Sequence, residues 1–276
     1  MSLLTATVRR GLLLFGLVVL LYPVAWIVAT SLKPPAEVGQ VGLWPGEFTW
    51  SNYADGWLGV HGASFGTFLV NSTVIAAGSV IGNVVSCLLT AFALSRLSFP
   101  LRRFWFAVVI GTLLLPQHVL IIPQYMLFRE LDWVNTPLPL IIPKALATEA
   151  FFVFLMVQFL RALPDNYDES ARIDGAGPLR LFWYVILPLS RPALVTTATL
   201  SFIWTWNDYF PQLIYLPLIG DSTVPSGLRQ YAVAGGLTEL GPMFAMCVLS
   251  VVPVLLFFVA FQRLLISGTT PSRIRG

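Results

Sequence analysis

Long apolar stretches separated by short polar connections make up most of the chain. Six of them are near the roughly 20 residues that a helix needs to cross the hydrocarbon core of a bilayer. They predict membrane-spanning helices at residues 11–30, 68–94, 104–127, 140–160, 193–216 and 242–264. The pattern indicates an all-α, polytopic membrane protein with six spans, in which residues 1–276 form a single transmembrane domain.

The connection at residues 161–192 is more charged and richer in turn residues than the others. Asp168 and Glu169 lie where a helix would begin, and carboxylates there complement the positive end of the helix dipole. Gly175 can adopt the left-handed backbone that ends a helix. Pro178 suits the first position of a second helix. We therefore predict two short helices joined by a glycine bend.

The second short helix has an apolar side. Leu179, Phe182, Trp183 and Ile186 follow the helical spacing i, i+3, i+4 and i+7. Pro188 is expected to stop or kink the helix that carries them. Anchoring alone does not require such a loop between two spans, so the pattern predicts a docking element for a cytoplasmic partner.

Composition and charge support a membrane location. The chain is 57% hydrophobic and 11% charged, whereas a soluble domain carries about a quarter charged residues. With both termini and residues 161–192 placed on one side, that side holds twelve of the sixteen basic residues, which the positive-inside rule assigns to the cytoplasm. The net charge of +3 then needs no nucleic-acid partner.

The sequence lacks the patterns of an enzyme. No G-x-x-x-x-G-K-[ST] phosphate loop occurs, so the chain is not expected to hydrolyse ATP itself. Cys87 and Cys247 lie in apolar runs and give no signal of a disulfide or metal site. His61 and His118 have no spaced carboxylate partners, so we expect no catalytic residue, no metal ligand and no cofactor bound by this chain.

Ionisable residues inside a span are candidate functional residues because burying them without a partner costs several kcal/mol. Asn207 and Asp208 are expected near the middle of the fifth span, and Glu149 about one-third into the fourth. We predict that they line a pathway or contact a second permease, although packing is the alternative role. Lys144 precedes Glu149 by five residues and is a poor helical partner for it.

Residues 169–176, ESARIDGA, followed by Leu187-Pro188 and Pro192, resemble the EAA motif of ABC importer permeases. The family pattern reads roughly E-A-A-x-x-D-G-A with a later L-P-x-x-x-P, and Ser170 stands here for an alanine. In that family the loop forms coupling helices that insert into a groove on the ATP-binding subunit. The resemblance implies this contact for Asp168, Glu169, Ser170, Ala171, Arg172, Asp174, Gly175, Ala176, Leu179, Phe182 and Pro188.

The resemblance extends over nearly the whole chain. Residues 116–143 are similar to the third span and following loop of carbohydrate-type importer permeases, and residues 206–209, WNDY, to their fifth-span signature. Residues 261–276 resemble their closing tail, of which 265–276 is expected in the cytoplasm. Asp174 before Gly-Ala favours the carbohydrate class, with similarity to the smaller permease subunit of maltose importers.

This family resemblance implies the type I ABC importer permease fold and a location in the inner or plasma membrane. The implied partners are a homologous permease, two ATP-binding subunits that hold ATP and Mg, an extracytoplasmic solute-binding protein and the lipid bilayer. A sugar or sugar-like solute is expected. The alternatives are an importer for an amino acid, phosphate or glycerol-phosphate, and a secondary transporter, which usually shows internal repeats.

Overall fold

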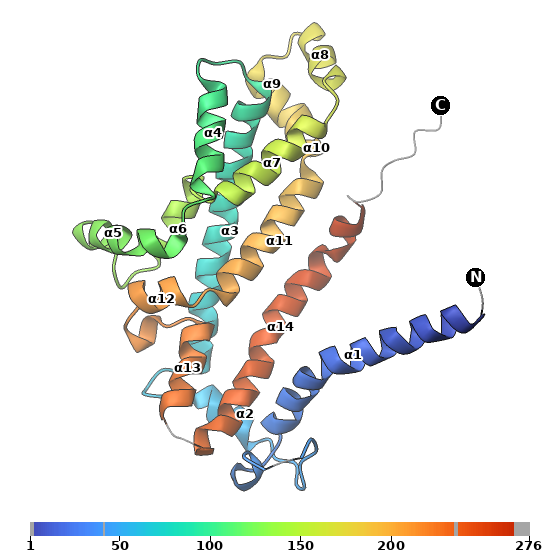
Figure 1. The fold of residues 1–276 in the computed structure, drawn as a ribbon. Helices are drawn as coiled ribbons and strands as arrows, with labels where there is room; N and C mark the ends of the chain where they lie inside the picture. Colours follow the sequence, from blue (N-terminus) through green and yellow to red (C-terminus); the bar gives the residue numbers. More distant parts are fainter. Residues whose placement is uncertain (1–2, 41, 235–236, 268–276) are drawn as a thin grey trace. The chain divides into compact units, whose positions relative to one another are not determined.

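The computed structural model describes residues 3–40, 42–234 and 237–267, which are mostly helical (Figure 1). Among these residues the only β-type contact is an isolated bridge between Val60 and Ala63. The predicted all-α class is therefore confirmed. In chain order the helices are α1 (Leu3–Ser31), η1 (Pro35–Glu37), α2 (Ser51–Leu58), α3 (Phe65–Arg96), α4 (Arg102–Thr112), α5 (Gln117–Glu130), α6 (Leu138–Ala145), α7 (Ala150–Ala162), α8 (Asn166–Ile173), α9 (Pro178–Leu181), η2 (Phe182–Ile186), α10 (Leu187–Leu189), α11 (Arg191–Asn207), α12 (Phe210–Tyr215), η3 (Ile219–Asp221), α13 (Val224–Ala234) and α14 (Leu237–Ser267).

Within the part of the chain that the structure describes, four helical segments are long and apolar enough to cross a membrane, and they overlap the predicted first, second, fourth and sixth spans. They are Thr7–Ser31, Phe65–Arg96, Leu138–Ala162 and Leu240–Gln262. The helices Pro178–Leu189 and Arg191–Asn207, which meet at 70°, add a fifth if the bent pair is one span. The count of six spans stays a prediction.

The predicted third span is divided, so the prediction of one continuous helix at residues 104–127 is wrong. α4 ends at Thr112 and α5 begins at Gln117. Pro116 explains the break, because a proline lacks the N–H and its ring clashes with the carbonyl four residues earlier, which here belongs to Thr112. Figure 1 shows the two helices running in different directions.

A second proline divides the predicted fifth span in the same way. α11 ends at Asn207, four residues before Pro211, and α12 begins at Phe210. Asp208 has an extended backbone, with φ −67° and ψ 129°. Asn207 and Asp208 therefore lie at the end of a helix, which corrects the expectation that they lie in the middle of a span.

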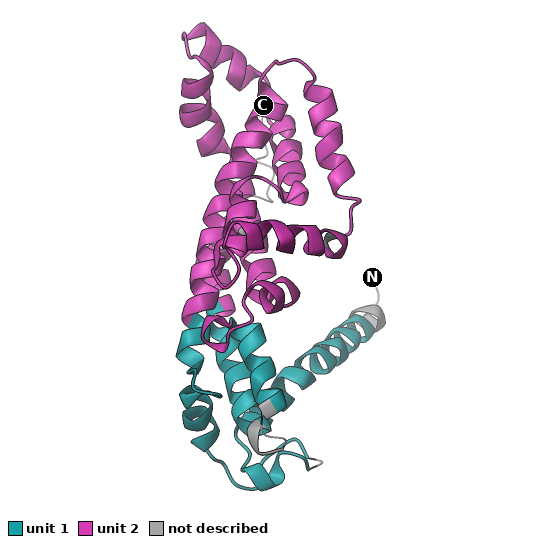
Figure 2. Cartoon of the chain, turned by 90° about the vertical axis from the view of Figure 1, so that its left-hand side faces the viewer, with its two compact units in different colours: residues 1–69, 223–253 teal, residues 70–222, 254–276 magenta. Residues whose placement is uncertain are grey.

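Packing divides the chain into two compact units, residues 1–69 with 223–253 and residues 70–222 with 254–276 (Figure 2). Helices α3 and α14 contribute residues to both, so a single transmembrane domain stays a prediction. In the first unit Asn52 is buried and its Nδ2 donates to the carbonyls of Ser31, 2.9 Å, and Lys33, 2.8 Å. These bonds satisfy carbonyls at and beyond the end of α1, which lack helical partners.

The core of the second unit is built around α7. Phe152, Val153, Met156, Val157 and Leu160 recur on one side of this helix and are fully buried. They pack with buried residues of α3, η2 and α11. This core holds the predicted docking loop and the polar residues of the predicted fourth and fifth spans within one unit.

Candidate functional site

The predicted docking loop forms two short helices around a glycine corner, as expected. Gly175 follows α8 with φ +75°, a left-handed conformation. The N–H of Ala176 donates to the carbonyl of Ala171, 2.9 Å, and that of Gly175 to the carbonyl of Arg172, 3.0 Å. These two bonds form the Schellman arrangement that closes a helix.

The helix starts in the loop also follow their sequence signals. Asp168 and Glu169 lie in the first turn of α8. Pro178 is the first residue of α9, where its missing N–H leaves no bond unmade. A bend of 70° separates the helix that contains Pro188 from α11. The observed helices confirm the predicted course of the loop, which was predictable because these signals are local.

The candidate residues of the loop differ in exposure. Most of them lie at the surface: Glu169, Ser170, Arg172, Asp174, Gly175, Leu179 and Pro188 are exposed, and Ala171 and Ala176 are half-buried. Asp168 and Phe182 are buried, and the Phe182 ring contacts that of Phe92 with centroids 5.2 Å apart. These two residues face the core instead of presenting a surface to a partner.

The predicted apolar side of the second short helix is split. Phe182 and Ile186 are buried, whereas Leu179 and Trp183 are exposed. Residues Phe182–Ile186 form a π-helical turn, in which the N–H of Leu187 bonds the carbonyl of Phe182 five residues back. The turn departs locally from α-helical spacing, and the buried face is narrower than the i, i+3, i+4, i+7 pattern predicted.

Sequence reasoning did not single out Arg96, the last residue of α3. Its Nη1 lies 2.6 Å from Oδ1 of Asp165 and 3.2 Å from Oδ2 of Asp168. Its Nη2 donates to the carbonyls of Leu160, 2.5 Å, and Leu163, 2.8 Å. The side chain is 4% exposed. A charged residue at the end of an apolar span was the available signal, but its partners are distant in the sequence.

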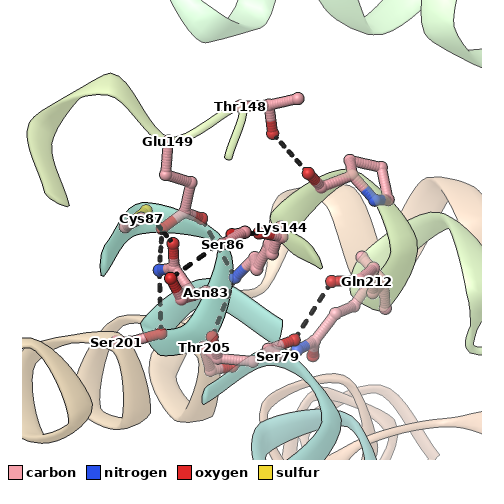
Figure 3. Close-up of polar contacts among 12 residues, drawn as sticks. Ser79, Asn83, Ser86, Cys87, Lys144, Thr148, Glu149, Ser201, Thr205 and Gln212 are labelled. Carbon is pink, nitrogen blue, oxygen red and sulfur yellow. Dashed lines mark hydrogen bonds and ion pairs between the residues drawn. The ribbon is translucent and has the colours of Figure 1, made fainter. Parts of the chain in front are cut away.

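A second polar cluster lies where the fourth predicted span is interrupted (Figure 3). Nζ of Lys144, in α6, is 3.3 Å from Oε1 of Glu149, which precedes α7. The two residues are not partners along one helix, as their spacing predicts; they meet instead because the chain is not helical from Leu146 to Glu149, where Ala147 has φ +56°. Ser86 of α3 holds the break: its Oγ donates to the carbonyl of Lys144, 3.0 Å, and accepts from the N–H of Ala147, 3.2 Å.

The cluster connects four helices. Asn83 of α3 is fully buried, and its Nδ2 donates to Oε2 of Glu149, 2.9 Å, and to Oγ of Ser201 in α11, 3.1 Å. Lys144 donates to Oγ1 of Thr205, 2.8 Å, also in α11 (Figure 3). Each of these half-buried charges is therefore paired and hydrogen-bonded, which offsets its loss of water.

Asn207 and Asp208 are not joined to this cluster by a hydrogen bond or ion pair among the contacts described. Asn207 is exposed, and its Nδ2 donates to the carbonyl of Ile203, 2.8 Å, within its own helix. Asp208 is half-buried, and its N–H bonds the carbonyl of Thr205, 3.3 Å. The structure thus places Glu149 in a polar network and the other two candidates at the adjoining helix end.

Two further predictions concern metal binding and the C-terminal tail. Among the described residues no group of three or more His, Cys, Asp or Glu side chains is arranged to hold a metal ion. Residues 268–276, which contain most of the predicted cytoplasmic tail, lie outside the described residues.

Comparison with known proteins gives consistent matches along the chain. Residues 82–270 match the family described as binding-protein-dependent transport system inner membrane component. The sn-glycerol-3-phosphate transport system permease protein UgpE of Pectobacterium atrosepticum is 33% identical, over 96% of this chain and 98% of its own. UgpE of Shigella flexneri is 32% identical, over 95% and 94%.

A solved structure has the same fold. It is a chain of a bacterial ABC transporter involved in the import of the acidic polysaccharide alginate, with a TM-score of 0.80 over 94% of this chain and 96% of that chain. The two sequences are 24% identical. The docking loop and the polar cluster lie within residues 82–270, which match the family, and Asn83 and Ser86 lie near the start of this range.

Proposed function

This chain belongs to the family of binding-protein-dependent transport system inner membrane components, and we propose that it forms half of the translocation pathway of an ATP-driven importer. It is a multi-pass membrane transport component and not itself an enzyme. The other half would come from a homologous permease. Two ATP-binding subunits, which hold ATP and Mg, and an extracytoplasmic solute-binding protein complete the proposed complex.

The proposed solute is a sugar or a sugar-like compound. The similarity to permeases named for sn-glycerol-3-phosphate makes this phosphorylated polyol the first compound to test. The charges of Lys144 and Glu149 balance each other in their ion pair, so this pair by itself gives no preference for a charged solute. An importer for an amino acid or for inorganic phosphate is the alternative outcome.

The glycine corner between α8 and α9 carries the proposal of ATPase docking. Ile173 and Leu179 flank the corner and are 85% and 76% exposed. Large apolar side chains at this exposure on a charged loop suit a surface that another protein covers. We define the docking surface as Glu169, Arg172, Ile173, Asp174 and Leu179, all of which are exposed.

Membrane orientation follows from the same proposal. An ATPase works in the cytoplasm, so docking on this surface requires α8 and α9 to be cytoplasmic. The excess of basic residues assigned to that side supports this, and it places both chain termini in the cytoplasm. Trp183 and Tyr184, exposed in the turn that leads toward α11, then suit the interfacial layer of the bilayer, where aromatic residues gather.

A matched pair of variants tests the docking proposal. Leu179→Asp places a charge in the docking surface, whereas Leu58→Asp makes the same change at a leucine that is also 76% exposed, in α2. We expect Leu179→Asp to reduce the ATP-binding subunit recovered with the purified complex at least tenfold, and Leu58→Asp to leave it unchanged. Equal recovery with both variants would contradict docking at this surface.

The transport function is tested by uptake into proteoliposomes that contain the complete importer. The solutes are sn-glycerol-3-phosphate, maltose, glutamine and inorganic phosphate. In each assay ATP is supplied on the side of the membrane that carries the ATP-binding subunits. We expect ATP-dependent uptake of one of the first two. Uptake of glutamine or phosphate alone would move the protein to another importer class, and uptake driven by an ion gradient without ATP would contradict the proposal.

A further inference from the structure

Arg96 occupies a position where three helices meet. It ends α3, its guanidinium contacts the carbonyls of Leu160 and Leu163 at the end of α7, and it contacts Asp165 and Asp168 at the start of α8. Its positive charge therefore lies between the negative end of one helix and carboxylates at the positive end of the next. Each of the two terminal nitrogens serves one of these helices.

The attachment of α8 depends on this contact. Asp168 is the one buried residue of α8, and its side chain is 9% exposed. Ala171 adds a half-buried methyl group against the core, whereas the rest of the helix is exposed. A helix with so little apolar burial gains little from the hydrophobic effect, and the buried ion pair is the contact that joins it to α3.

Only arginine fits this arrangement. The planar guanidinium directs Nη1 to carboxylates and Nη2 to carbonyls, a division that a single lysine ammonium group cannot reproduce. Removing Arg96 would leave Asp168 buried without its counter-ion, which is strongly unfavourable. Asp165 would lose less, because its side chain is 86% exposed and remains in water.

We infer that Arg96 is a positioning residue for energy coupling: it fixes α8 to the ends of α3 and α7, so that a displacement of α8 moves both helices with it. This inference rests on the proposed docking of an ATPase at the α8–α9 corner. The inference predicts that loss of Arg96 uncouples ATP hydrolysis from solute uptake, which docking alone does not predict. A complex without Arg96 still presents Ile173 and Leu179 to the ATPase, but α8 then moves on its own.

The test uses the complete importer with Arg96→Met, Arg96→Lys, Asp168→Asn and Asp165→Asn. Arg103→Met is the matched control, since Arg103 lies at the start of α4, the next helix, and is exposed. Solute uptake and ATP hydrolysis are measured together in proteoliposomes, with the solute that is imported in the four-solute uptake assay described above. For Arg96→Met we expect normal recovery of the ATPase and at least half of the stimulated hydrolysis, but at least tenfold less solute imported per ATP.

The other variants give a graded expectation. Asp168→Asn should resemble Arg96→Met, Arg96→Lys should be intermediate, and Asp165→Asn and Arg103→Met should change the ratio less than twofold. An unchanged ratio in Arg96→Met, or a parallel fall in hydrolysis and uptake, would overturn the inference. Recovery of the ATPase with Leu179→Asp tests docking alone, whereas the amount of solute imported per ATP in Arg96→Met tests the positioning role. Failure of one proposal can therefore be told from failure of the other.

A distance measurement tests the same inference without activity. Spin labels at Ser98 and Ser170, both exposed, report the separation between the turn after α3 and α8. We expect one narrow distance distribution in the native complex and a broad one in Arg96→Met. Should Arg96→Met fail to insert, Arg96→Lys and Asp168→Asn carry the measurement, and narrow distributions in both would refute the positioning role.

Discussion

Arg96 and Asp168 are 72 residues apart in the sequence, yet their side chains meet at 3.2 Å and are both buried. Their free energies of burial are therefore coupled, because each charge is favourable only while the other is present. We expect Arg96→Met and Asp168→Leu to destabilise the purified protein separately, and the double variant to be more stable than the sum of the single effects predicts.

The measurement for this pair is a double-mutant cycle of thermal unfolding in detergent. A coupling of about 1–3 kcal/mol is expected for residues in contact in one network. The corresponding cycle with Arg103→Met and Asp168→Leu provides the control, since Arg103 is exposed. Additive effects in both cycles would show that the Arg96–Asp168 contact contributes no coupling.

Gly175 is expected to tolerate substitution poorly because of its backbone and not because of its surroundings. No atom lies within 4 Å of a Cβ placed there, but φ is +75°, a region that costs an L-residue about 1–2 kcal/mol. We expect Gly175→Val to reduce uptake and solute-stimulated ATP hydrolysis at least fivefold with normal membrane insertion. Gly177 is also unobstructed and has φ −73°, so Gly177→Val should retain most activity.

Asp208→Asn separates a charge requirement from a packing role. The substitution keeps the shape of the side chain at the end of α11 and removes its charge. We expect it to reduce uptake at least threefold while the second permease is still recovered with the complex. Asp132→Asn, an exposed aspartate whose left-handed backbone also suits asparagine, is the control. Full uptake by Asp208→Asn would leave Asp208 with a packing role only.

The proposed topology predicts which single cysteines react with a membrane-impermeant thiol reagent. Cys87 and Cys247 are first replaced by alanine, because the second is only half-buried. Cysteines at Ser98 and Ser170 should react only from the cytoplasmic side, and those at Asp55 and Gly220 only from outside; all four positions are exposed. Labelling with the two sides exchanged would contradict the orientation and the docking of an ATPase at α8.

Local signals explain what could be predicted from the sequence. The carboxylates at the start of α8, the left-handed Gly175 and Pro178 at the start of α9 each act within one helical turn, so the helix limits of the docking loop were predictable. The helix ends at Thr112 and Asn207 were predictable too, because each precedes a proline by four residues. Apolar length alone hid them, since hydropathy averages across a break.

Contacts between distant segments explain what could not be predicted. Neither proline nor glycine lies between Lys144 and Glu149 to mark the break there; a serine in another helix stabilises it. The partners of Arg96 are likewise known only once α3, α7 and α8 are packed. Which residues of the second short helix are buried, Phe182 and Ile186 but not Leu179, depends on packing against α3, and the spacing along the chain alone does not reveal it.

Lys144 and Glu149 belong to one segment, Leu138–Ala162, so their charges can cancel as soon as that segment leaves the ribosome. A lone charge at the centre of a membrane helix raises the free energy of insertion by about 2.5–3.5 kcal/mol, and pairing within the segment lowers whatever cost its two charges carry. Asn83, synthesised earlier, is ready to receive Glu149, whereas Thr205 reaches Lys144 only later. Pairing within one segment thus leaves the hydrogen bonds to Asn83 and Thr205 as the contacts that form when the helices pack.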